Sequence, residues 1–189
     1  DSPLVLEIKS MSFGRALIKE EKEPILIVDL EKTLTNFCLF DKGESKLSIS
    51  APIAGEKFTQ VISEKLKIPL REAEKLKMEI GLNPQKKGGR IFLILQQEIQ
   101  KIIEEIRNIN DYYQKKSAQS IKKIILTGDS ALLPNLPEYL SENLEKKVSI
   151  GDPWAKININ ALKGKKDLLE AVEIESVFYA PAIGSALRG

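Results

Sequence analysis

The chain has 189 residues, of which 42% are hydrophobic and 30% are charged, and its formal net charge is +2. These values are ordinary for a soluble globular protein. Acidic and basic residues are interspersed, which argues against a dedicated nucleic-acid surface. The absence of histidine excludes histidine-based catalytic triads and histidine metal ligands. The single cysteine, Cys38, excludes an intrachain disulfide, and we expect it to be a buried small hydrophobic residue rather than a nucleophile.

No apolar run approaches the ~20 residues that a membrane-spanning helix needs, and no signal-peptide pattern is present. The chain starts at Asp1 in the middle of a pattern, so we expect it to be part of a longer protein. A cytoplasmic location is the expectation that fits these features.

The first half predicts a helix, a β-meander and then two more helices. The apolar run that contains Asp29 is typical of a strand covered on both faces, and Asp41-Lys42-Gly43 is a hairpin signal. The expected elements are a helix over 6–19, strands over 25–30, 37–40 and 46–50, helices over 56–66 and 69–80, and a polar loop over 83–89.

The longest predicted helix covers 90–116 and carries one apolar face. Its apolar residues follow helical spacing: Phe92, Leu95, Ile99, Ile102, Ile103, Ile106, Ile109 and Tyr113. Such a face suits either a coiled-coil partner or packing within the same chain. We favour internal packing, because the pattern lasts only about three heptads.

The second half predicts strands alternating with helices, so the fold class is a mixed α/β lobe. We expect strands over 121–126 and 148–150 and helices over 136–144 and 179–187, with a basic turn over 163–166, a short helix over 168–172 and no clear pattern over 157–162. The predicted division places 1–66 and 122–189 in one subdomain and 67–121 in an inserted, mainly helical one.

Three groups of residues could carry chemistry. Asp29 ends a strand, where a carboxylate can orient Mg²⁺-bound water, and the hydroxyls of Thr33 and Thr35 can bind phosphate oxygens. Aspartate and threonine are also common in turns, so these residues could be purely structural.

The other two groups lie further along the chain. Gly128 would let the backbone approach a flat ligand such as a nucleoside, whereas Asp129 and Ser130 could simply cap the next helix. Glu74 and Lys77 share one helix face, where they could form a surface ion pair or reach a ribose or adenine.

Seven segments occur along the chain in this order: "MSFGRALI", "LIVDLEKTLTNFCLF", "PIAGEKFTQVI", "AEKLK", "LTGDSALLPNL", "DPW" and "YAPAIGSALR". Taken together, they resemble the actin-like ATPase superfamily. The nearest likeness is to the PilM family of type IV pilus assembly proteins, which is related to the division protein FtsA. The resemblance implies an actin-like (ribonuclease H-like) lobe with a mixed sheet and an inserted helical sublobe.

The resemblance also implies a nucleotide site for ATP and Mg²⁺ in the full-length protein. Asp29, Thr33 and Thr35 would face the phosphates, with Asp29 reaching the metal through water. The helix pair Glu74 and Lys77 would reach the nucleoside, and Gly128, Asp129 and Ser130 the adenosine.

The chain departs from the family pattern at three glycine positions, which are occupied by Glu31, Asp129 and Asn135. A carboxylate ~4 Å from a phosphate costs about 1–4 kcal/mol. We therefore expect weak or absent nucleotide binding.

The implied role is a cytoplasmic scaffold of the inner-membrane platform of a type IV pilus, or of a related type II secretion system. Such a protein would lie at the membrane through partners such as PilN, could self-associate, and would bind no nucleic acid. The first phosphate motif belongs to an earlier lobe, so we do not expect an enzyme. The alternatives are an FtsA-like division protein, an active ATPase or sugar-kinase-like enzyme, and a structural homologue without nucleotide.

Overall fold

The computed structural model describes residues 9–19, 23–156 and 179–188. Its centre is one mixed sheet of five strands in the order β3-β2-β1-β4-β5. The β1, β2 and β3 strands form an antiparallel meander, whereas β4 and β5 continue the sheet in parallel with β1. The strands are β1 Ile25–Leu30, β2 Thr35–Asp41, β3 Glu44–Ala51, β4 Lys123–Thr127 and β5 Lys147–Ile150.

The helices are α1 Lys9–Leu17, α2 Gly55–Leu66, α3 Leu70–Ile80, α4 Arg90–Ser117, α5 Leu136–Leu144 and α7 Ala180–Ala186, with 3₁₀ turns η1 Lys86–Gly89, η2 Asp129–Leu132 and η3 Pro153–Lys156. These elements confirm the predicted order and the mixed α/β class. The predicted loop over 83–89 is partly wrong, because it closes into η1 directly before α4. The predictions for 157–162, 163–166 and 168–172 lie outside the described residues.

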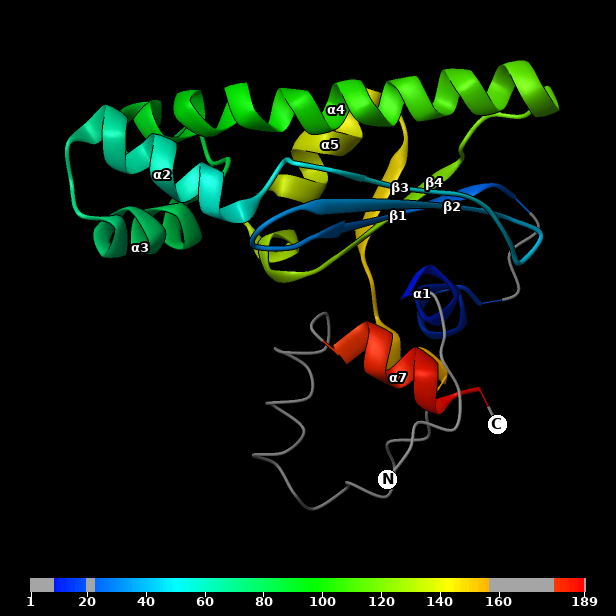
Figure 1. Cartoon of the computed structure of the whole chain (residues 1–189). Helices are drawn as coiled ribbons and strands as arrows, with labels where there is room; N and C mark the ends of the chain where they lie inside the picture. The colour runs from blue at the N-terminus through cyan, green and yellow to red at the C-terminus, as the bar shows by residue number, and fades with distance from the viewer. Residues whose placement is uncertain (1–8, 20–22, 157–178, 189) are drawn as a thin grey trace.

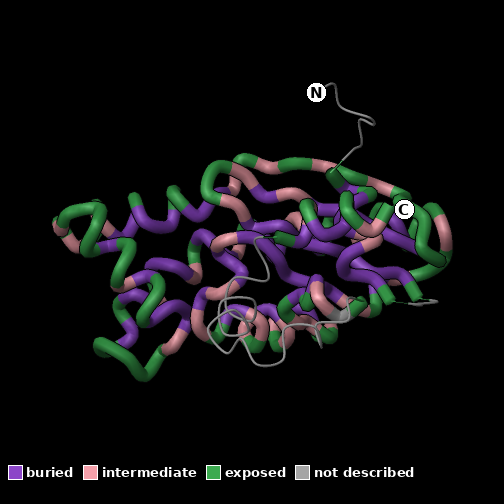
Figure 2. Tube along the Cα trace, turned by 90° about the horizontal axis from the view of Figure 1, so that it is seen from below, coloured by how far each residue is buried: buried purple, intermediate pink, exposed green. Residues whose placement is uncertain are grey.

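Helices cover both faces of the sheet (Figure 1). The α4 and α5 helices lie over one face, whereas α1 and α7 lie over the other. Every residue of β1 is buried, as predicted for a strand covered on both faces. Buried positions run through the centre of the molecule and exposed ones gather on its outer turns (Figure 2).

The long helix α4 packs within the chain. Its buried residues belong to one hydrophobic cluster with alternate residues of β1, β2 and β4, including Leu26, Phe37 and Leu126. Ile99, Ile102, Ile103 and Ile106 of this helix are fully buried. The interpretation of internal packing is therefore confirmed, and the division at 67–121 stays a prediction.

The opposite face of the sheet packs on α1 and α7. Cys38 is buried there, as predicted, beside Ile27 and Phe40. The two helices approach closely at Gly184, where an added Cβ would lie 1.8 Å from the Ser12 carbonyl oxygen. In the part of the chain that the structure describes, no helix is long and apolar enough to cross a bilayer.

A buried hydrogen bond joins the end of α4 to the β2–β3 hairpin. Tyr113 donates its hydroxyl to Asp41 Oδ2 at 2.8 Å, and both residues are buried. Asp41 Oδ1 has no hydrogen-bond partner among the described residues. The hydrogen bond from Tyr113 therefore offsets much of the free energy that burying the Asp41 side chain costs.

Replacing this donor is expected to destabilise the fold. Tyr113→Phe should lower the free energy of unfolding by about 1–3 kcal/mol, because it leaves a buried carboxylate without its hydrogen bond. Urea denaturation measures the change. Tyr112→Phe is the matched control, since Tyr112 is 52% exposed, and equal effects of the two substitutions would contradict the assigned role of Tyr113.

Candidate functional site

The site forms where β1 and β4 end. These strands are parallel, and Asp29 pairs in register with Thr127, so the residues that follow both strands meet at one edge. Gly128 follows directly with φ +87° and ψ 173°, a conformation that is essentially restricted to glycine. A Cβ at Gly128 would lie 2.7 Å from the Leu30 carbonyl oxygen. Glycine is therefore required here by both conformation and space.

The turn between β1 and β2 holds the start of α2. The Glu31 amide donates to the Leu34 carbonyl at 3.1 Å and closes the turn. The amides of Gly55 and Glu56, in the first turn of α2, donate to the carbonyls of Glu31 and Lys32 at 3.0 and 2.9 Å. The β1–β2 turn and the N-terminus of α2 are thus fixed relative to each other.

A hollow of about 310 Å³ lies beside Asp29, and we call it the Asp29 hollow. Asp29 is buried, and its Oδ2 accepts hydrogen bonds from Lys9 Nζ at 2.9 Å and Asn36 Nδ2 at 3.1 Å. The same Lys9 ammonium also pairs with Glu31. The hollow is lined by Lys9, Asp29, Glu31, Lys32, Thr33, Gly128, Asp129 and Pro181.

Burial and charge act in opposite directions on this cluster. Burial raises the pKa of Asp29, and the repulsion of Glu31 adds to it, although Lys9 and Asn36 work against the shift. For Lys9, burial alone would lower the pKa, but its bonds to Glu31 and Asp29 outweigh burial and raise it. The Lys9 ammonium is therefore held in its charged form between two carboxyl groups.

A second hollow of about 470 Å³ lies against α3, and we call it the Glu74 hollow. Lys77 is buried, and its ammonium contacts Glu74 Oε2 at 2.7 Å, Thr59 Oγ1 at 2.9 Å and the Gly55 carbonyl at 3.1 Å. The hollow is lined by Lys32, Gly55, Glu56, Glu74, Lys77, Met78, Asp129 and Ser130. The two hollows adjoin at Lys32 and Asp129, whose charged groups lie 4.0 Å apart.

The contacts of Glu74 predict a dependence of stability on pH. Burial would raise the pKa of Glu74, but Lys77 and Thr59 outweigh burial and lower it below 4.5. A lowered folded-state pKa stabilises the fold above the unfolded value, and this contribution disappears as pH falls through the folded value. Glu74→Gln should therefore be less stable than the wild type at neutral pH, with the gap closing below about pH 4.5.

Thermal denaturation from neutral pH to about pH 3 measures this gap. Glu79→Gln is the matched control, because Glu79 is on the same helix and its pair with Lys75, at 3.7 Å, is exposed. A gap for Glu74→Gln that stays constant across this range would contradict the assignment.

Seven of the eight candidate residues line the two hollows. Asp29, Thr33 and Gly128 line the first, Glu74, Lys77 and Ser130 line the second, and Asp129 lines both. Their roles toward a ligand stay predictions.

Thr35 does not join this group. It is buried, and its hydroxyl donates to the Ile53 carbonyl at 2.6 Å. Asn36, the next residue along β2, contacts Asp29 instead, because successive side chains of a strand point to opposite faces.

Sequence reasoning also missed Lys9 and Thr59 as members of the site. Lys9 lies 20 residues before Asp29, and no spacing rule joins a helix start to a strand end across that distance. Thr59 lies one turn after Gly55 on α2 and could have been found from helical spacing.

The carboxylates of the site do not form a ready metal centre. No group of three or more acidic or cysteine side chains that could hold a metal ion occurs among the described residues. One oxygen of Asp29 is engaged by Lys9 and Asn36. The cation that Asp29 contacts in this fold is the Lys9 ammonium.

A family model described as type IV pilus assembly protein PilM matches residues 8–189. The chain belongs to the PilM family. This confirms the resemblance inferred from the sequence segments. A search of curated protein sequences gave no match.

Solved structures confirm the actin-like fold of this PilM family member. The PilM-PilN type IV pilus biogenesis complex matches with TM-score 0.77 and 20% identity, over 98% of this chain and 53% of that chain. MreB5 of Spiroplasma citri bound to ADP matches with TM-score 0.61 and 17% identity, over 89% and 60%. EutJ from Carboxydothermus hydrogenoformans matches with TM-score 0.53 and 22% identity, over 76% and 48%. The chain therefore spans about half the length of the first of these structures.

Asn135, which the resemblance assigns to a glycine position of the family pattern, adopts a conformation that glycine favours. Its φ is +62°, in the left-handed region that asparagine tolerates better than most residues. Glu31 and Asp129 have no positive φ. At those two positions the departure from glycine adds a carboxylate without straining the backbone.

Proposed function

We propose that the chain is the second lobe of a cytoplasmic scaffold in the inner-membrane platform that assembles type IV pili, or of a related type II secretion platform. The observation that carries the proposal is the family model, which matches nearly the whole chain.

The partner that best suits this role is a PilN-type membrane protein. The solved structure with TM-score 0.77 is a complex of PilM with PilN. A protein of this family can then lie at the membrane through its partner. Self-association is a further proposal, which sedimentation of the full-length protein would test.

The charges around the two hollows support a site altered toward weak or absent nucleotide binding. The Asp29 hollow has three acidic side chains, Asp29, Glu31 and Asp129, against two lysines. Both lysines already face carboxylates, Lys9 at Asp29 and Glu31, and Lys32 at Asp129. A triphosphate would add negative charge to this set. The phosphates of any ATP bound there would compete with Asp29 and Glu31 for the Lys9 ammonium.

Deletion of the gene in its native host tests the proposed role. We expect loss of surface pili, or of type II secretion, and restoration by the wild-type gene. The full-length protein should also co-purify with the host's PilN-type protein. Normal pili and secretion in the deletion strain would contradict the proposal, and a division defect with normal pili would favour the FtsA-like alternative.

An active ATPase or sugar-kinase-like enzyme is the alternative from another functional class. Its mark would be turnover of ATP by the full-length protein that depends on Asp29. The likeness to MreB5 shows the shared fold but is not evidence for an activity, because the identity is only 17%.

A further inference from the structure

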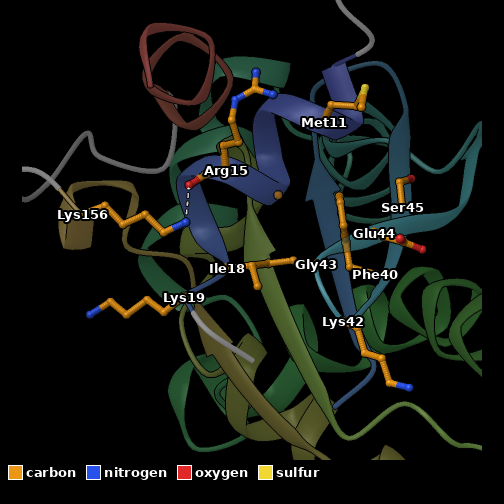
Figure 3. Close-up of a pocket in the computed structure, with 11 residues that line it drawn as sticks. Met11, Arg15, Ile18, Lys19, Phe40, Lys42, Gly43, Glu44, Ser45 and Lys156 are labelled. Atoms are coloured by element: carbon orange, nitrogen blue, oxygen red, sulfur yellow. Dashed lines mark hydrogen bonds between the residues drawn. The ribbon is translucent and has the colours of Figure 1, made fainter. Parts of the chain in front are cut away.

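A groove of about 1090 Å³ lies between α1 and the β2–β3 hairpin, and we call it the basic groove. Figure 3 shows Arg15 of α1 and Lys19, which follows the end of α1, on one side and Lys42 of the hairpin turn on the other. The volume of the groove slightly exceeds the usual range for ligand pockets, so it has room for a short segment of chain.

The floor of the groove is apolar. Phe40 and Ile18 lie there, exposed to only 3% and 6%. Gly14 brings α1 close to this floor, since an added Cβ would lie 2.6 Å from the Phe40 ring. Met11 borders the same groove and is 50% exposed. Because Phe40 and Ile18 are almost fully buried, Met11 offers the accessible apolar contact of the groove.

The rim of the groove is cationic. Four basic residues line it, Arg15, Lys19, Lys42 and Lys156. Among the described residues, the one acidic residue that lines the groove is Glu44, and it is already paired with Lys46 at 2.6 Å.

The four cations differ in their contacts. Lys156 donates to the Arg15 carbonyl at 2.7 Å, which joins η3 to α1, and Arg15 Nε donates to the Gly184 carbonyl at 2.8 Å. Within the described ranges, Lys19 and Lys42 have no ion-pair partner. These two exposed lysines, on opposite sides of the groove, leave positive charge available to an incoming anion.

We propose that the basic groove binds an acidic segment of a partner protein, which places an apolar side chain against Met11 and its carboxylates against Lys19 and Lys42. An apolar anchor surrounded by charges of opposite sign is a usual arrangement at protein interfaces. A nucleic acid would leave the exposed Met11 side chain without a matching apolar group, and a flat lipid surface would not enter the groove.

The groove is distinct from the candidate nucleotide site. No described residue that lines the groove also lines the Asp29 hollow or the Glu74 hollow. Both regions share only helix α1, which carries Lys9 at its start and Met11, Gly14 and Arg15 further along. Binding in the groove therefore requires no nucleotide, and its test is independent of the proposed function.

Fluorescence anisotropy on the full-length protein tests the proposal. The probes are labelled peptides of about ten residues, rich in Asp and Glu, with Leu and Phe placed at each position in turn. We expect binding that weakens as salt is added, because the lysines are exposed. Lys19→Glu/Lys42→Glu should weaken it at least about tenfold, because each reversal turns attraction into repulsion. Met11→Ser should weaken it about threefold through loss of apolar contact.

The matched control is Lys57→Glu/Lys115→Glu, which makes the same change in net charge at two exposed lysines on α2 and α4. This control variant should bind the peptides as tightly as the wild type does. The affinity of the wild type for the peptides should also be the same with and without ATP. Serine in place of Leu and Phe in the probe should abolish binding. The proposal is overturned if no peptide binds, if both double variants lose affinity equally, or if only vesicles with anionic lipid bind in a way that depends on Lys19 and Lys42.

Discussion

Gly128→Ala is expected to lower the free energy of unfolding by about 3–5 kcal/mol. The φ and ψ of Gly128 lie in a region that costs other residues about 1–3 kcal/mol. The added Cβ would also meet the Leu30 carbonyl oxygen at 2.7 Å and Asp29 Oδ1 at 2.8 Å. Because both atoms belong to residues of the buried central strand β1, they have little room to move. Urea denaturation of the variant and the wild type measures the difference.

Gly43→Ala is the control that separates backbone strain from collision. Gly43 also has a positive φ, +79°, but an added Cβ there would meet no atom within 4 Å. We expect a loss of about 1–2 kcal/mol from strain alone. If the two variants lose equal stability, the close approach of Gly128 to β1 is not what the fold depends on.

Glu31→Gln is expected to raise the affinity of the full-length protein for ATP by about tenfold, the equivalent of about 1.4 kcal/mol. The substitution removes one negative charge from the Asp29 hollow. It also releases the Lys9 ammonium from one of its two carboxylates, so that the ammonium can face a phosphate. Glu31 is about one-third exposed, which places the gain at the lower end of the range for a carboxylate near a phosphate.

Isothermal titration with ATP and Mg²⁺ measures this gain, and the fold should be nearly unaffected, since exposed ion pairs contribute about 0–1 kcal/mol. Glu64→Gln, on the exposed face of α2, is the matched control and should leave the affinity unchanged. Unchanged or weaker binding by Glu31→Gln would show that this carboxylate does not limit nucleotide affinity.

The order of elements could be predicted because each has a strong local signal. The run that contains Val28 is too apolar for an exposed strand, and the spacing from Leu95 to Tyr113 fits one helix face. The hairpin signal at Lys42 and Gly43 was sufficient because both residues adopt positive φ in the two-residue turn.

The candidate site was predictable only in part, because its contacts join distant segments. The order of the family-like segments predicted that Asp29, Glu74 and Gly128 belong to one site. In the structure, the two hollows that these residues line adjoin at Lys32 and Asp129. The ammonium of Lys9 could not be predicted, since its position depends on how α1 packs under the sheet. Thr35 could have been judged better from the sequence, because strand alternation turns it away from Asp29 and places Asn36 beside it.

Isothermal titration of the wild-type full-length protein with ATP and Mg²⁺ tests the central claim most directly. The charges of Asp29, Glu31 and Asp129 predict a dissociation constant weaker than about 100 µM, or no measurable heat. Circular dichroism on the same sample would establish that the protein is folded. Micromolar binding that Asp29→Ala abolishes would contradict the claim and would assign this PilM family member a retained nucleotide site.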